Sequence, residues 1–435
     1  MTAQLAALAI PGIPILGALI GLLMWKKPES LKPWLLIVAI ASLVAIVSTS
    51  GHASSPPANL FLLFLLPLMA FVTLLGQPVH AAHARAWLLT LVLLGLGLGV
   101  LASEAPISPI FFLLLLASVA LMLFYDRGQS ADAWWGIGAL GFGIIGVAVA
   151  LVADPPISVV AFALACATAL PLAPFHKGYV AALTRLPGNL PAFLALLLPV
   201  TGFHGLIAAL PQFPDVLSNI VKGLALVGML YASLKALTQS RAASVVAYGG
   251  LAFLSMLWWY LTTAGSSAPQ IVVYLSAVSL AGSGLLLAWF MLRARYGEMG
   301  LRALSGLAQP MPRFAIAVSL LALAALGLPP FGVFSGFMGL LLAPSFTWTS
   351  GVLVVILAWL SASWYLFELV QGLLFGRRQT ERRHEDLRDP ELTSLVIVLV
   401  LLVALGVLPS RLFGVGTSEG AIQRTAVVEF PAWTK

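Results

Sequence analysis

The chain has 435 residues, of which 61% are hydrophobic and only 9% are charged, and its formal net charge is +7. Soluble domains carry roughly 25% charged residues, so this composition excludes a soluble globular protein. Long apolar runs recur without the alternation of barrel strands, which predicts an all-α polytopic membrane protein. The basic residues lie in loops between apolar runs and indicate membrane topology, so no nucleic-acid partner is expected.

Apolar runs of about 20 residues, each able to span a bilayer, predict about fourteen transmembrane helices. The first run lacks a basic leader region, so we expect a membrane helix there and not a cleaved signal. In chain order the predicted helices cover residues 3–24, 33–50, 59–76, 85–103, 107–125, 133–153, 156–173, 189–210, 216–237, 242–263, 269–292, 314–343, 350–375 and 392–414.

The loops between these helices alternate in charge. Most of the 22 Lys and Arg follow odd-numbered helices, whereas the loops after even-numbered helices hold Glu104, Asp154 and Asp215. By the positive-inside rule the basic loops are cytoplasmic, which predicts an integral protein of the bacterial inner membrane with both termini outside. Segment 377–391 mixes both signs and is predicted to be a solvated cytoplasmic loop and a candidate docking surface for a partner.

Two predicted helices are expected to break at paired prolines. Pro171 and Pro174 lie in LPLAP at the end of helix 7, and Pro329 and Pro330 lie in GLPPFG within helix 12. Proline removes a backbone donor and breaks a helix, and paired breaks in corresponding halves are typical of inverted-repeat transporters. Helices 7 and 12 are five apart, which predicts five-helix repeats of opposite topology, helices 4–8 and 9–13. The simpler alternative is that these prolines only kink packed helices.

This pattern divides the chain into five segments. They are helices 1–3 (residues 1–84), the first repeat (85–210), the second repeat (211–376), the charged loop (377–391), and helix 14 with the C-terminal tail (392–435).

Three motifs carry a family resemblance. They are PLAPFHKGYVAALTRLPGNLPAFLAL, beginning at Pro171, then ALTQSRAASVVAYGGLAFLS at 236–255, and LGLPPFGVFSGF at 326–337. In this order they resemble the antiporter-like membrane subunits of respiratory complex I, with relatives in Mrp cation/proton antiporters, energy-converting hydrogenases and inorganic-carbon uptake complexes. The resemblance implies proton transfer along buried ionisable side chains, beside other membrane subunits and a soluble subunit.

The proton-carrying residues of that family do not carry over. An acid in helix 5 and lysines in helices 7, 8 and 12 are what the resemblance implies. The corresponding positions hold Leu115, Ala169, Pro199 or Val200, and Phe337. The chain is therefore expected to keep the scaffold and to depart from the family's usual relay.

Other ionisable residues remain as proton-relay candidates, each with a simpler alternative. His176 matches the family histidine after the first break, and His204 lies deep in helix 8, where it could instead bond a neighbouring helix. Lys222 and Lys235 in helix 9 could both snorkel to an interface. Glu368 is the only acid well inside a predicted span, and its alternative is pairing with a partner subunit or with Gln371. The polar cavity candidates are Gln239, Tyr248 and Ser335.

Two functions follow from these observations. The first is an antiporter-like subunit that translocates protons, or couples their movement to a partner's chemistry. The second is a proton-inactive structural subunit of a complex I-like, hydrogenase-like or carbon-uptake membrane complex. The chain has one cysteine and lacks a phosphate-binding loop, an HExxH motif and haem-ligand pairs, so no metal or cofactor is expected. A redox activity would therefore belong to partner subunits.

Overall fold

The computed structural model describes residues 2–50, 57–126, 131–265, 270–297, 300–342, 351–375 and 384–408. Every regular element in these ranges is a helix, and 10 helices are long and apolar enough to cross a membrane. Shorter apolar helices lie among them. The all-α prediction is thus confirmed for the described residues, whereas the number of fourteen crossings stays a prediction.

The helices follow the predicted apolar runs closely. They are α1 (Thr2–Leu23), α2 (Pro28–Ser50), α3 (Pro57–Leu75), α4 (Ala84–Ala102), α5 (Ile107–Tyr125), α6 (Ala131–Val152), α7 (Ile157–Ala169), α8 (Lys177–Arg185), α9 (Leu190–Ala209), α10 (Asp215–Leu237), α11 (Ala242–Ala264), α12 (Gln270–Tyr296), α13 (Pro312–Ala325), α14 (Gly332–Leu341), α15 (Gly351–Leu374) and α16 (Asp389–Val407). Short 3₁₀ turns cover Ala81–His83, Leu210–Gln212 and Leu301–Leu304.

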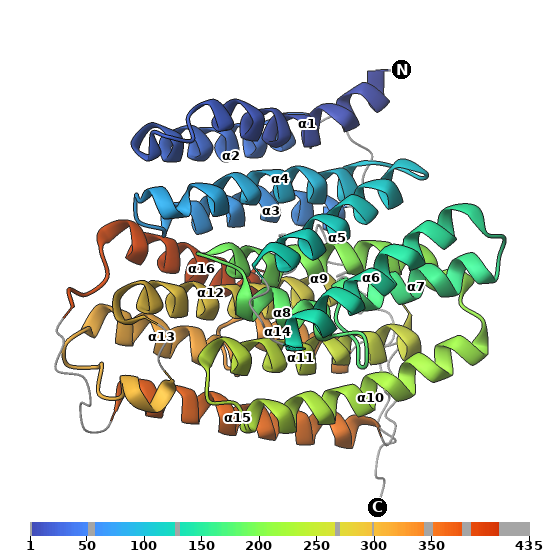
Figure 1. The fold of residues 1–435 in the computed structure, drawn as a ribbon. Helices are drawn as coiled ribbons and strands as arrows, with labels where there is room; N and C mark the ends of the chain where they lie inside the picture. The colour runs from blue at the N-terminus through green and yellow to red at the C-terminus, as the bar shows by residue number, and fades with distance from the viewer. Residues whose placement is uncertain are drawn as a thin grey trace, which may run out of the picture.

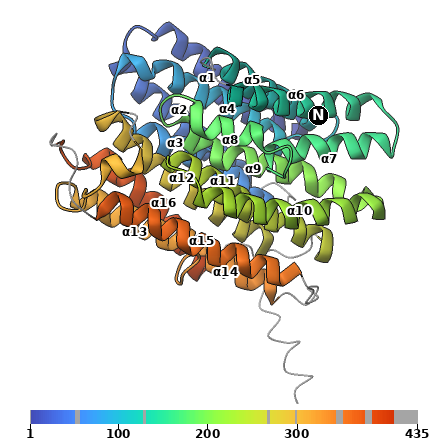
Figure 2. The same ribbon diagram turned by 60° about the horizontal axis from the view of Figure 1, so that its bottom comes forward.

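The helices lie side by side in one bundle (Figure 1). α1 and α2 form one edge, and α10 and α15 lie at the opposite edge. α11 and α12 are almost wholly buried in the middle. The buried faces of α12 include small residues such as Ser279, Ser283 and Gly284, which let neighbouring backbones approach closely. Figure 2 shows the same bundle turned so that α14 and α15 come forward.

The first proline pair interrupts the helical ladder between α7 and α8. The Leu170 N–H donates to the Cys166 carbonyl at 2.8 Å, an ordinary helical bond, and the Leu172 N–H then donates to the Ala167 carbonyl at 3.1 Å, five residues back. Pro171 has no N–H to donate, so the ladder widens there before it stops. The segment 170–176 between α7 and α8 is called the first break below.

The second proline pair interrupts the chain between α13 and α14 in the same way. The Leu326 N–H donates to the Ala322 carbonyl at 2.8 Å, and the Leu328 N–H donates to the Leu323 carbonyl at 3.2 Å. Gly327 adopts φ +72°, a left-handed conformation that favours glycine. The segment 326–331 is called the second break, and its backbone hydrogen bonds repeat those of the first.

The sequence prediction missed part of this arrangement. Helix 7 was expected to end at its prolines, but the structure shows a separate nine-residue helix, α8, after the first break. Lys177 and Arg185 lower the hydropathy of α8, so it is absent from the apolar runs. The single helix predicted at 314–343 is two helices, because Pro329 and Pro330 end the ladder of α13.

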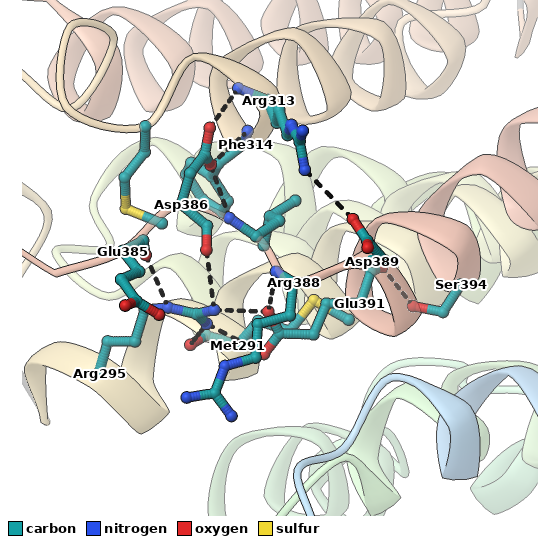
Figure 3. A network of polar contacts seen from close by, with 12 residues as sticks. Met291, Arg295, Arg313, Phe314, Glu385, Asp386, Arg388, Asp389, Glu391 and Ser394 are labelled. Atoms are coloured by element: carbon teal, nitrogen blue, oxygen red, sulfur yellow. Dashed lines mark hydrogen bonds and ion pairs between the residues drawn. The ribbon is translucent and has the colours of Figure 1, made fainter.

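Polar contacts tie the chain together at one end of the bundle (Figure 3). Arg295, at the end of α12, donates from Nη1 and Nη2 to the two carboxylate oxygens of Glu391 in α16, the first contact at 3.1 Å. The same guanidinium donates to the carbonyls of Glu385 and Asp386 at 3.2 and 3.3 Å. Both side chains of the pair are nearly buried, at 12% and 7% exposure.

The carboxylate of Asp386 caps the N-terminal end of α13. It accepts hydrogen bonds from the backbone N–H groups of Arg313 at 2.7 Å and Phe314 at 3.2 Å. These are unpaired donors of the first turn, so Asp386 acts as a cap from a remote segment. Segment 377–391 was expected to be simply solvated; residues 384–391 are instead docked onto α12 and α13, and residues 377–383 lie outside the described residues.

Lys32 precedes the helix predicted at 33–50, but α2 begins at Pro28, so Lys32 lies within α2 and is buried. Its ammonium donates to the carbonyl of Leu75 at 3.1 Å and to that of Gln77. These carbonyls end α3, where a cation also complements the helix dipole. Lys32 therefore joins α2 to α3, at the same end of the bundle as Arg295 and Glu391.

Candidate functional site

His176 closes the first break and lies at the centre of an aromatic cluster. Its ring centroid is 5.5 Å from that of Tyr231 in α10 and 6.2 Å from that of Tyr248 in α11. The two tyrosine rings are 6.4 Å apart. The first break thus brings a titratable imidazole against two phenol-bearing helices of the other half of the chain.

His176 is only 4% exposed, and neither ring nitrogen has a hydrogen-bond partner within the described residues. A buried polar group without a partner costs about 1–3 kcal/mol. Both ring nitrogens are therefore available to a water molecule or to another hydrogen-bonding group. The structure thus keeps the family histidine buried against two tyrosine rings.

The carbonyl freed by the first break is satisfied from α11. The indole Nε1–H of Trp258 donates to the Leu170 carbonyl at 3.1 Å. Freed backbone groups at membrane depth need such protein partners. This contact holds the break beside α11, the helix that also carries Tyr248.

A small cavity of about 30 Å³ lies beside the second break. Ala325 and Val333, on either side of the break, line it together with Gly249 of α11, Gly282 of α12 and Tyr365 of α15. A volume of this size holds a water molecule if polar partners are present. The hydroxyl of Tyr365 is buried without a partner among the described residues, so it offers one.

Two neighbouring glycines of α11 admit tyrosine hydroxyls. A Cβ at Gly249 would lie 2.9 Å from the Tyr365 hydroxyl oxygen, and one at Gly250 would lie 3.1 Å from that of Tyr179 in α8. Any larger residue would push these hydroxyls away. The YGG sequence therefore places three phenols, including Tyr248, around one stretch of α11.

A pocket of about 520 Å³ opens at the end of the bundle where the basic connections gather, called the basic end below. Glu368, Gln239 and Gln371 contribute polar groups to its lining. Tyr365 lines this pocket as well as the small cavity. Tyr365 therefore lies between the pocket that holds the exposed carboxylate of Glu368 and the cavity beside the second break.

A second large pocket, of about 640 Å³, opens at the opposite, acidic end. His204 lines it from α9, with Glu104 and Ser103 from the connection between α4 and α5. The Ser103 hydroxyl is buried without a partner in the described part of the chain. His204, a proton-relay candidate from the sequence, thus faces a recess that contains polar side chains.

Of the remaining candidates, Gln239 lines the basic-end pocket, whereas Lys222, Lys235 and Ser335 line none of these three sites. Lys222 is half-buried and Lys235 is exposed on α10, and Ser335 is half-buried in α14. Gln239 donates to the Lys235 carbonyl at 3.0 Å, which places its amide at the helix end. Within the described residues, no three His, Cys, Asp or Glu side chains lie close enough to hold a metal ion.

Sequence reasoning missed Tyr231, Trp258 and Tyr365. Their aromatic side chains are ordinary in apolar helices, so no pattern distinguishes them from lipid-facing or core residues. The only available signal was the glycine pair at 249–250, which indicates a close approach to α11.

The family model described as "NADH:quinone oxidoreductase/Mrp antiporter, TM" matches residues 133–363, just over half of the chain. NADH-quinone oxidoreductase subunit M of Pseudomonas aeruginosa is 27% identical over 263 residues, which cover 59% of this chain and 52% of that protein. The same subunit of Escherichia coli K12 is 27% identical over 271 residues, covering 60% and 52%. The chain therefore spans about half the length of the curated relatives it matches.

Solved structures share the fold over nearly the whole chain. A subunit of respiratory complex I from Thermus thermophilus gives a TM-score of 0.76 at 18% identity and covers 93% of this chain and 96% of its own. A chain of the archaeal membrane-bound sulfane sulfur reductase gives 0.79 at 17%, covering 96% and 97%. A chain of the Mrp complex from Dietzia gives 0.78 at 16%, covering 93% and 95%. At these sequence identities, the structural similarity is evidence for a shared fold only.

Proposed function

Because the chain belongs to the NADH:quinone oxidoreductase/Mrp antiporter transmembrane family, we propose that it is an antiporter-like membrane subunit of a multi-subunit complex. In this role it translocates protons, or couples their movement to the chemistry of a partner. Its partners are other membrane subunits and a soluble subunit. The proton-inactive structural alternative is not favoured, because the site keeps titratable and hydroxyl groups where the chain is interrupted.

One observation carries the proposal: Tyr365 lines both the basic-end pocket and the cavity at the second break. Glu368 lies three residues away in the same pocket and is the titratable group of that opening. A proton accepted there reaches the interior through the Tyr365 hydroxyl and water in the cavity. This route needs none of the family's missing lysines.

The internal part of the route runs along α11. Gly249 borders the cavity, and its neighbour Tyr248 contacts the His176 ring in the first break. The proposed order is Glu368, Tyr365, cavity water, Tyr248 and His176, and a further water must bridge the step to Tyr248, because Tyr248 does not line the cavity. His204, in the acidic-end pocket, is the titratable group of the opposite opening.

Topology and repeats form part of the same proposal. The basic end is cytoplasmic by the positive-inside rule, in a bacterial inner membrane with both termini outside. Residues 85–210 and 211–376 are two inverted repeats, which the matching backbone hydrogen bonds of the two breaks support. Labelling of cysteines at Lys27 and Glu104, in a Cys166→Ser background, tests the orientation: only the latter should react with an impermeant reagent from outside.

The test of the route is proton flux in proteoliposomes that contain the purified complex. Glu368→Gln, Tyr365→Phe and His176→Leu should each lower the flux strongly, because each removes one exchanging group. Glu29→Gln and Tyr125→Phe are matched controls, since both positions are exposed and lie outside the route. His204→Ala tests the acidic-end opening in the same assay.

Flux unchanged by Glu368→Gln and by His176→Leu would refute the relay. Absence of flux through this subunit, with loss of the assembled complex on its deletion, would instead support the structural alternative. Assembly of every variant is checked by recovery of the partner subunits.

A further inference from the structure

The outward face of α15 carries a regular seam of exposed side chains. Leu360 and Trp364 are 67% and 68% exposed. The spacing alternates between four and three residues along the whole helix, through Leu353, Leu357, Leu360, Trp364, Phe367 and Gln371. Such a 3.5-residue repeat presents a straight seam to a second helix and fits side chains between those of a neighbour.

The second break borders this seam and is itself exposed. Leu328, Pro329 and Pro330 are exposed on the side of the bundle. The break follows the 14 residues of α13, so along the helix axis it lies far from the basic end. An apolar groove of about 710 Å³ runs between the break and α15, lined by Leu326, Leu357, Leu360, Ser361, Ser363, Trp364 and Phe367. The Ser361 hydroxyl is buried there without a partner among the described residues.

Lipid is a poor occupant for this groove. Irregular backbone at membrane depth is tolerated where protein or water covers it, and not against hydrocarbon. The first break is covered within the chain over most of its length, since Leu170, Pro171, Leu172 and His176 are buried, although Pro174 is exposed. The described residues cover the second break only in part: Gly406 of α16 packs against the Pro330 carbonyl and Trp359 packs against Gly327, whereas Leu328 and Pro329 are exposed.

Glu368 indicates which type of side chain must lie against this surface. It is exposed on α15 one helical turn beyond Trp364, within a predicted membrane span. A carboxylate on an outward membrane face requires a basic or hydrogen-donating neighbour. The outward face of α6 provides the contrast: Phe142 and Ile145 are 64% and 62% exposed, and residues 133–152 contain no charged side chain.

We propose that the α15 seam and the second break form the docking surface for a transmembrane helix of a different subunit, which carries a Lys or Arg side chain level with Glu368. The partner helix covers the exposed prolines, fills the groove with apolar side chains and places a basic side chain beside Glu368 at the mouth of the basic-end pocket. The proposal rests on the chain being a subunit of a complex, and it does not depend on proton conduction.

The test is site-directed cross-linking of the intact complex in native membranes. In a Cys166→Ser background, Leu360→Cys and Trp364→Cys are labelled with a photoactivatable maleimide, and Ile145→Cys is the matched apolar control. Positions 360 and 364 should give adducts that map to one transmembrane helix of another subunit, and that helix should contain a Lys or Arg. Position 145 should give lipid adducts only.

A charge exchange then tests the pairing itself. Glu368→Lys should reduce the partner recovered with the chain by about tenfold or more, because it opposes like charges at the interface. Exchanging the mapped basic residue for Glu should restore the recovery. Lipid adducts at 360 and 364, adducts to a second copy of this chain, or failure of the exchange would each overturn the proposal. Partner recovery is measured separately from proton flux, so this outcome is independent of the relay.

Discussion

Trp258 and Leu170, 88 positions apart in the chain, are joined by a hydrogen bond of 3.1 Å from the indole N–H to the peptide carbonyl. The bond crosses from α11 to the first break, which connects the two proposed repeats. It satisfies a carbonyl that the prolines release from the helical ladder. The interruption is therefore held in place by a helix of the other half.

Replacing Trp258 by Phe should destabilise the protein. The change leaves the Leu170 carbonyl buried without its donor, which costs about 1–3 kcal/mol. The loss appears as a lower unfolding midpoint of the purified protein in detergent. Trp135→Phe is the control, because Trp135 is 70% exposed. Equal midpoints for the two variants would contradict the role of the indole N–H.

Gly249→Ala should displace the Tyr365 hydroxyl. The added methyl group would lie 2.9 Å from that oxygen, too close for an ordinary contact, and overpacking of this kind costs about 1–3 kcal/mol. Gly223→Ala, where nothing lies within 4 Å, should instead be neutral or stabilise α10 by up to about 1 kcal/mol. Unfolding midpoints of both variants measure the difference.

Tyr365→Phe should relieve part of the defect of Gly249→Ala, because it removes the oxygen at 2.9 Å but keeps the ring carbons at 3.1 and 3.2 Å from the added methyl group. The double variant is therefore expected to unfold at a higher temperature than Gly249→Ala alone. It should not regain proton flux, since the hydroxyl of the proposed route is absent. A double variant that is no more stable than Gly249→Ala would place the clash elsewhere.

The Arg295–Glu391 pair should contribute more than the exposed pair beside it. Removal of one member of a buried ion pair costs about 3–5 kcal/mol, because the other charge stays buried without its partner. Glu391→Gln should therefore lower the unfolding midpoint strongly. Asp389→Asn breaks the contact with Arg313. The side chains of Asp389 and Arg313 are 92% and 56% exposed, so this change should alter the unfolding midpoint little. Similar midpoints for Glu391→Gln and Asp389→Asn would contradict this difference.

The sequence indicates the two breaks through prolines that lack an N–H to donate. Proline spacing alone does not decide the outcome, because Pro11 and Pro14, spaced like Pro171 and Pro174, lie inside the continuous helix α1. The choice between lipid-facing and core helices is different. α6 and α12 are both apolar on all sides, yet α6 is largely exposed and α12 almost wholly buried. An apolar surface fits lipid and protein equally well, so the pattern does not distinguish them.

The site is predicted less completely than the fold. His176 follows from its motif, and Glu368 from being an acid within a span. Tyr365 becomes a candidate only when α15 packs against the second break, a relation between distant segments. Residues 384–391 resemble a solvated loop because their charges are numerous; the buried partners of Glu391 and Asp386 lie 72 or more positions away.

Lys32 also depends on partners that are distant in the sequence. Its charge suggests a loop residue, yet it is 8% exposed and donates hydrogen bonds to the carbonyls of Leu75 and Gln77. Lys32→Met keeps the apolar stem and removes the donor, so two carbonyls at the end of α3 lose their partner. The expected cost is about 1–3 kcal/mol, measured as a lower unfolding midpoint. Lys27→Met, at an exposed position, should leave the midpoint unchanged, and an equal effect of both changes would show that Lys32 acts only through net charge.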